Sequence, residues 1–171
     1  MHLPCFVKGF FAREEGDLMK IIIVDNHQNY SEGLKHLLEL TLPGSYIKSF
    51  SLNSFSNRYQ IIETPDLLII DPYIEKEISE KIIKRLIKND TKVILLTSDN
   101  NHEKDVLDLL KYRISGYLFK SSRTAKLISL IKGIVFRDSK YIEPSVANIL
   151  ISKYQNEILS DKNVEKEYVN V

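Results

Sequence analysis

Four apolar runs along this chain of 171 residues are each followed by a residue whose side chain can bind charged groups. The runs cover 21–24, 67–70, 93–96 and 117–119, and the residues that follow them are Asp25, Asp71, Thr97 and Lys120. If the runs are parallel strands of an open α/β sheet, their carboxyl ends lie at the edge where ligands bind. Two carboxylates, a hydroxyl and an ammonium group at one edge predict a functional site there.

The chain between these residues alternates between strand and helix patterns. Helices are expected between the strands, including one that Asn100 or Asn101 caps and that carries Val106 and Leu109. Nearly continuous apolar strands are typical of a parallel sheet that helices cover on both faces. The sequence predicts an α/β fold with a doubly wound five-stranded parallel sheet, in a single domain over 19–137. The strands are expected at 20–24, 46–50, 66–70, 92–96 and 115–119.

The two ends of the chain are expected to lie outside this domain. Residues 1–18 lack the layout of a signal peptide, and two interpretations stay open: a disordered leader, or a true start at Met19 rather than Met1. At the other end, Glu143 and Pro144 are expected to begin an extra helix, because proline is favoured in a first helical turn. This helix would form a linker over 138–159, followed by a charged and frayed tail over 160–171.

Composition excludes several classes of protein. The formal net charge is +1, which shows no overall bias towards nucleic acids, membranes or acidic partners. Cys5 is the only cysteine, so the sequence supports neither a disulfide framework nor a cysteine-based metal site. No run approaches the roughly 18 apolar residues of a membrane helix. These features predict a cytoplasmic protein without a membrane partner.

Four stretches in this order resemble the receiver domain of bacterial two-component response regulators. They are Ile21–His27 (IIIVDNH), Pro65–Asp71 (PDLLIID), Val93–Ser98 (VILLTS) and Gly116–Lys120 (GYLFK). Asp138–Ala147 further resembles the LuxR/NarL-type subfamily, in which a helix at this position leads towards a DNA-binding domain. The resemblance covers about Met19 to Leu159 and implies the (βα)5 flavodoxin-like receiver fold.

The resemblance implies a role for each residue at the sheet edge. Asp71 would accept a phosphoryl group, Lys120 would supply a cation to the phosphoryl oxygens, and Thr97 would hydrogen-bond the phosphorylated state. Such a transfer needs charge neutralisation more than covalent assistance. Tyr117 matches the aromatic residue whose rotamer switches together with the Thr97 shift. Phosphorylation would thereby bias a contact surface formed by the fourth helix, fifth strand and fifth helix.

The resemblance also implies a Mg²⁺ site, but the residues around it depart from the family pattern. The metal ligands would be Asp25, Asn26, Asp71 and the Tyr73 carbonyl. Asn26 stands where the family usually has a second acid, so one negative charge is missing and the attraction for a divalent ion is weaker. Pro72 and Tyr73 also depart from the usual loop after Asp71. The sequence therefore predicts an atypical receiver in which Mg²⁺ binding is weak or absent.

The histidines show no ligand spacing and are interpreted as surface or packing residues: His27, His36 and His102.

The function that the sequence favours is signalling rather than enzymatic catalysis. The protein is expected to accept a phosphoryl group on Asp71, with a sensor histidine kinase or another regulator as partner, and to act by protein–protein contact that includes homodimerisation. Direct DNA binding is not expected, because the chain has no basic stripe and no helix-turn-helix domain follows Leu159. Two alternatives stay open. One is a phosphorylation-independent module that dimerises with or titrates a regulator, and the other is an α/β phosphohydrolase or nucleotide-binding domain.

Overall fold

Six parallel strands form one sheet in the order β2-β1-β3-β4-β5-β6. The computed structural model describes residues 18–98 and 108–168, with side chains described as far as Asn156. The strands are β1 (Lys20–Val24), β2 (Tyr46–Phe50), β3 (Leu67–Ile70), β4 (Lys92–Thr97), β5 (Gly116–Phe119) and β6 (Tyr141–Ile142). The helices are α1 (Gln28–Thr41), α2 (Leu52–Ser56), α3 (Lys76–Lys88), α5 (Thr124–Arg137) and α6 (Pro144–Tyr168).

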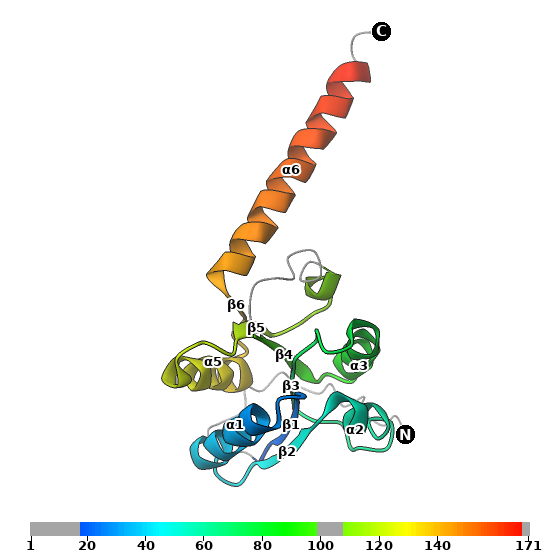
Figure 1. The fold of residues 1–171 in the computed structure, drawn as a ribbon. Helices are drawn as coiled ribbons and strands as arrows, with labels where there is room; N and C mark the ends of the chain where they lie inside the picture. The colour runs from blue at the N-terminus through cyan, green and yellow to red at the C-terminus, as the bar shows by residue number, and fades with distance from the viewer. Residues whose placement is uncertain (1–17, 99–107, 169–171) are drawn as a thin grey trace, which may run out of the picture.

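Helices cover both faces of the sheet, with α1 and α5 on one side and α2 and α3 on the other (Figure 1). Successive residues of β1 show the reason. Ile21 and Ile23 belong to one buried cluster, and Ile22 and Val24 belong to the other. A strand whose side chains alternate between two apolar layers must be covered on both faces. The predicted α/β fold with a doubly wound parallel sheet is therefore confirmed.

The structure adds a short sixth strand that the sequence did not predict. β6 pairs in parallel with β5 over two residues of each strand. Two residues are too few to show an apolar periodicity, and for that reason the strand escaped prediction. The expected extra helix is present as α6, which begins at Pro144 and runs to Tyr168. Helical structure thus extends into the 160–171 segment, for which we expected a frayed tail.

Two expectations concern segments between strands. The helix expected after Asn100 and Asn101 falls largely on residues 99–107, which lie outside the described residues. The leader expected over 1–18 also lies outside them, apart from the exposed Leu18. The polar segment after β2 forms the short α2 followed by turns. Ser51 caps α2, because its hydroxyl accepts a hydrogen bond from the Ser54 N–H at 3.2 Å.

Gly116 offers a test of the packing between β5 and α5. A Cβ atom at this position would lie 2.7 Å from Cδ1 of Ile134 and 3.4 Å from Cγ1 of Ile94, so the neighbouring side chains would have to shift. Gly116→Ala is expected to lower the free energy of unfolding by about 1–2 kcal/mol, as measured by urea denaturation. Gly33→Ala is the control. Gly33 lies within α1 with nothing within 4 Å of its Cβ position. Gly33→Ala should therefore raise the free energy of unfolding by about 0.5–1 kcal/mol. Equal stability of the two variants would contradict the packing argument.

Candidate functional site

The carboxyl ends of adjacent strands bring the predicted site residues together. Residues that directly follow β1, β3 and β5, and the last residue of β4, form the group: Asp25, Asp71, Lys120 and Thr97. Backbone hydrogen bonds continue the sheet pattern up to these positions. The Asp71 N–H donates to the Val24 carbonyl at 3.0 Å, and the Lys120 N–H donates to the Thr97 carbonyl at 2.7 Å. The backbone of the sheet therefore fixes the site residues in register.

The Lys120 ammonium lies between the two carboxylates. Its Nζ is 2.6 Å from Oδ2 of Asp25 and 2.8 Å from Oδ2 of Asp71. The side chains of Lys120, Asp25 and Asp71 are only 9%, 4% and 7% exposed. Burying a charge is costly unless it is paired and hydrogen-bonded. One ammonium here compensates two carboxylates, so one negative charge of this cluster is left over.

The second oxygen of each carboxylate organises the loop that follows it. Oδ1 of Asp25 accepts a hydrogen bond from the His27 N–H at 2.8 Å. Oδ1 of Asp71 accepts one from the Tyr73 N–H at 3.2 Å. In both loops an aspartate bonds the backbone two residues further on, as in an Asx turn. Each carboxylate is thus held by its own loop as well as by Lys120.

Three side chains at this edge offer metal-ligand atoms within 4.8 Å of one another, namely Asp25, His27 and Asp71. Carboxylates suit Mg²⁺, a hard cation that takes few protein oxygens and keeps several waters. The group is therefore consistent with the Mg²⁺ site of a receiver domain. Asn26, which we expected to be a ligand, uses its amide oxygen elsewhere, because its Oδ1 accepts a hydrogen bond from the Leu52 N–H at 2.9 Å.

His27 is the residue of this group that the sequence analysis missed. Its ring is 68% exposed, as expected of a surface residue, yet its Nδ1 lies 3.1 Å from Oδ1 of Asp25. The same nitrogen is 3.5 Å from Nζ of Lys120. The signal that could have revealed this contact is the position of His27 two residues after an aspartate that ends a strand. An Asx turn at such a position returns the backbone towards the carboxylate.

Tyr30 on α1 lies against the charged cluster. Nζ of Lys120 is 5.3 Å from the centre of the Tyr30 ring, within the range of a cation–π contact. Burial, and secondly the negative charge of Asp25, raises the pKa of the Tyr30 phenol to about 12. Tyr30 is therefore neutral at physiological pH and adds no charge to the site.

An uncharged group of hydroxyls lies in the same region of the sheet edge. Oγ1 of the fully buried Thr97 is 3.5 Å from the Tyr117 hydroxyl. The Tyr117 hydroxyl lies 3.1 Å from that of Tyr73. The structure thus brings together Thr97 and Tyr117, which the sequence predicted as partners. The structure also places the Tyr73 hydroxyl in this group, whereas the sequence analysis assigned only the Tyr73 carbonyl a role, as a Mg²⁺ ligand.

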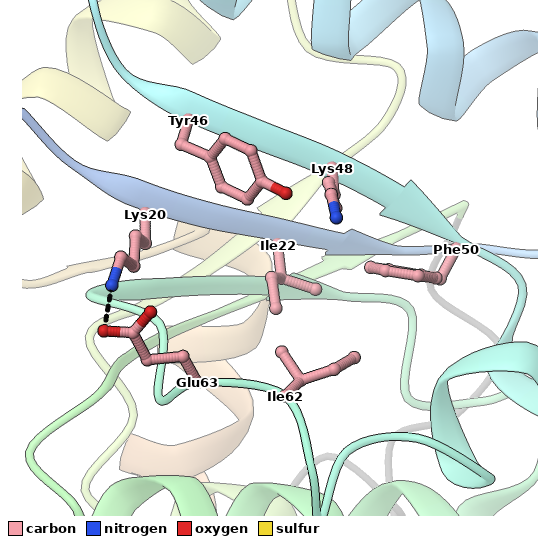
Figure 2. A pocket seen from close by; sticks show the side chains of 7 residues that line it. All are labelled: Lys20, Ile22, Tyr46, Lys48, Phe50, Ile62 and Glu63. Atoms are coloured by element: carbon pink, nitrogen blue, oxygen red, sulfur yellow. Dashed lines mark ion pairs between the residues drawn. The ribbon is translucent and has the colours of Figure 1, made fainter.

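A separate pocket opens beside β1 and β2 (Figure 2). Its volume is about 500 Å³, and its apolar lining includes Ile22, Phe50 and Ile62. Lys20 and Glu63 form an ion pair at its rim. None of the residues of the charged cluster lines this pocket, so the cluster and the pocket are distinct places on the molecule.

Comparison with known proteins identifies the family. A model of the response regulator receiver domain matches residues 21–132, which is more than half of the chain. The chain belongs to this family. An acidic pocket such as that of Asp25 and Asp71 is typical of phosphoacceptor domains in two-component signalling. A receiver domain is a phosphoacceptor rather than a catalytic enzyme, so the phosphohydrolase alternative loses its support.

Several relatives are LuxR/NarL-type regulators. The chain is 29% identical to the transcriptional regulatory protein DegU of Brevibacillus brevis, over 87% of this chain and 63% of DegU. It is 25% identical to the oxygen regulatory protein NreC of Staphylococcus carnosus, over 85% of this chain and 67% of NreC. The chain thus spans about two thirds of the length of these curated relatives.

Solved structures show the same fold. A LuxR-family two-component response regulator from Aurantimonas superposes with a TM-score of 0.64 at 21% identity, covering 81% of this chain and 99% of that one. The isolated receiver domain of RcsB from Salmonella enterica gives a TM-score of 0.62 at 21% identity, covering 78% and 99%. Among the residues that the structure describes, no helix combines the length and the apolar character needed to cross a membrane.

Removing the ammonium tests the charge balance of the cluster. Lys120→Met leaves Asp25 and Asp71 close together without compensation, so we expect the free energy of unfolding to fall by about 3–5 kcal/mol, measured by urea denaturation. Lys111→Met is the control. Lys111 pairs with Asp108 at 4.0 Å on the surface, and its loss should cost less than about 1 kcal/mol.

The same variant reports on the cation site. Mg²⁺ should restore part of the stability of Lys120→Met, because a divalent ion can replace the missing positive charge beside the carboxylates. The charge argument would be contradicted by similar losses in Lys120→Met and Lys111→Met.

Proposed function

We propose that this receiver domain accepts a phosphoryl group on Asp71 and passes the signal on by protein–protein contact. The observation that carries the proposal is the position of Asp71. It directly follows a central strand, it is buried, and one of its oxygens lies 2.8 Å from the Lys120 ammonium. A carboxylate held in this way can act as a nucleophile, and its cationic neighbour can take up charge from the phosphoryl oxygens.

The chemical step is an in-line transfer of a phosphoryl group from a nitrogen or oxygen atom of the donor to an oxygen atom of Asp71. An oxygen of Asp71 forms a bond to the phosphorus of a phosphohistidine or a small phosphodonor. The bond from phosphorus to the donor breaks, and the donor leaves with that electron pair. Lys120 neutralises the phosphoryl oxygens, and the Thr97 hydroxyl donates a hydrogen bond to one of them. When bound, Mg²⁺ supplies further charge neutralisation, held mainly by Asp25 and Asp71, with the Tyr73 carbonyl as a third donor.

The proposed partners follow from this chemistry. A sensor histidine kinase or another regulator supplies the phosphoryl group, and the domain acts in the cytoplasm. We also propose a homodimer as one of its assembled forms. A relative of known structure, RcsB, was observed as two dimers bound to two parallel DNAs.

A second candidate function is an interaction module that works without phosphorylation, by dimerising with or titrating a regulator. The observation that favours it is the engagement of Asn26. Its amide oxygen is bonded to the Leu52 N–H, and as a neutral residue it adds no charge to attract a metal. Both features weaken Mg²⁺ binding.

Phosphorylation can be measured directly by intact mass. Incubation with acetyl phosphate and Mg²⁺ is expected to add the mass of one phosphoryl group to the wild-type chain and none to Asp71→Asn. Asp90→Asn is a matched control, because Asp90 is exposed and its φ of 61° suits asparagine equally well; it should be modified like wild type. An adduct that persists in Asp71→Asn would refute the assignment. A complete lack of modification, together with no effect of beryllofluoride on the NMR spectrum, would favour the interaction module.

Restoring the missing charge provides a further test. Asn26→Asp should tighten Mg²⁺ binding by roughly tenfold, because an added carboxylate strengthens the attraction for a divalent ion. Titration calorimetry measures this affinity. Asn89→Asp introduces the same charge at an exposed position at the C-terminal end of α3, away from the strand ends that form the site, and should leave the Mg²⁺ affinity almost unchanged. Equal affinities of the Asn26→Asp variant and the wild type would speak against the charge deficit.

A further inference from the structure

Tyr117 is the largest fully buried side chain of the described core, with 1% of its surface exposed. It lies on β5 and packs in the same apolar cluster as Leu95 and Val146. Phe119, two residues along the strand, meets its ring edge-on at a centroid distance of 5.9 Å. Such a buried ring also buries its hydroxyl, and a buried phenol normally requires a hydrogen-bond partner.

Two hydroxyls approach that of Tyr117, and their distances differ. The Tyr73 hydroxyl lies at 3.1 Å and Oγ1 of Thr97 at 3.5 Å. Hydrogen bonds between hydroxyls usually measure about 2.5–3.0 Å. The contact with Thr97 is thus too long to be a strong bond, whereas the contact with Tyr73 is close to the usual range. Tyr73 is therefore the main polar partner of the buried phenol.

Tyr73 also contacts the carboxylate of Asp71. Its backbone N–H donates to Oδ1 of Asp71 at 3.2 Å. One residue thus bonds the carboxylate through its backbone and the Tyr117 ring through its side chain. The phenol–phenol bond involves no atom of Asp71, so it forms while that carboxylate is unmodified.

We propose that Tyr73 is a positioning residue that holds Tyr117 in its buried orientation in the absence of phosphorylation at Asp71. The buried orientation of the Tyr117 ring then depends on the Tyr73 hydroxyl as well as on the Thr97 hydroxyl. The signalling meaning of this orientation rests on the proposed function, but the contact itself does not. A receiver built in this way keeps the Tyr117 ring buried before any phosphorylation, and the Tyr73 backbone bond to Asp71 links the carboxylate to this contact.

The orientation of Tyr117 can be followed in the full-length chain by nitration with tetranitromethane and peptide mass spectrometry. In wild type, Tyr117 should be nitrated far more slowly than the exposed Tyr46 and Tyr154. In Tyr73→Phe the ring of residue 73 is kept and only its hydroxyl is lost. We expect nitration of Tyr117 to become about five to ten times faster, the effect of one lost hydrogen bond on a local opening equilibrium.

Three matched variants make the experiment decisive. Tyr112→Phe removes a phenol that bonds Glu80 instead and should leave the rate at Tyr117 unchanged. Thr97→Val should accelerate it less than Tyr73→Phe does, because the Thr97 contact is longer. Asp71→Asn keeps the acceptor oxygen and cannot be phosphorylated, so Tyr117 should stay protected.

Each reversal of this pattern would overturn the proposal. The reversals are an unchanged rate in Tyr73→Phe, a larger effect of Thr97→Val, or loss of protection in Asp71→Asn. The result is separate from the phosphorylation test, because an Asp71 that accepts no phosphoryl group leaves the nitration rates of these variants fully informative. Thermal unfolding followed by circular dichroism checks that the variants are folded under the reaction conditions.

Discussion

The contact on which the site depends is the Lys120 ammonium between two buried carboxylates. The three groups come from positions widely separated in sequence and meet because β1, β3 and β5 end at the same edge of the sheet. Their mutual attraction offsets the cost of removing them from water. The free oxygens of Asp25 and Asp71 then bond the backbone of the following loops, which fixes the start of α1 and the turn at Tyr73. The order of the two loops and the arrangement of the strand-end cluster therefore depend on the same two carboxylates.

The same cluster explains why this receiver is atypical. The three residues to which the receiver resemblance assigns phosphoryl transfer, Asp71, Lys120 and Thr97, lie at adjacent strand ends. At the position where the receiver resemblance implies a second acid, this chain has Asn26, and its amide oxygen bonds the first turn of α2. One left-over negative charge attracts a divalent cation less than two would. The exposed imidazole of His27 lies beside the two carboxylates, but a nitrogen donor is less suited to Mg²⁺ than an oxygen.

The sequence predicted the features that follow from repeated local patterns. Nearly continuous apolar strands predicted the covered parallel sheet, and residues at strand ends predicted the cluster around Lys120. The contact of Tyr73 with Tyr117 joins residues 44 positions apart, so no local pattern encodes it. His27 is exposed, as a surface residue should be, but its contact with Asp25 depends on the turn after β1, which no apolar pattern reveals. β6 was missed because a two-residue strand is defined by its partner and not by its own sequence.

The backbone pairing of β6 with β5 at Tyr117 connects the sheet to the long helix α6. β6 is hydrogen-bonded to β5 beside this residue, and α6 begins two residues after β6 and projects away from the sheet (Figure 1). The buried carboxylate of Glu143 clamps this junction through Ser122 and Lys126. A helix of 25 residues is about 37 Å long. If the clamp transmits a rotation of about 10° from β5, the far end of α6 sweeps about 6 Å. A helix anchored at one end by this short pairing would therefore turn a small rotation at β5 into a displacement of several ångströms at its far end.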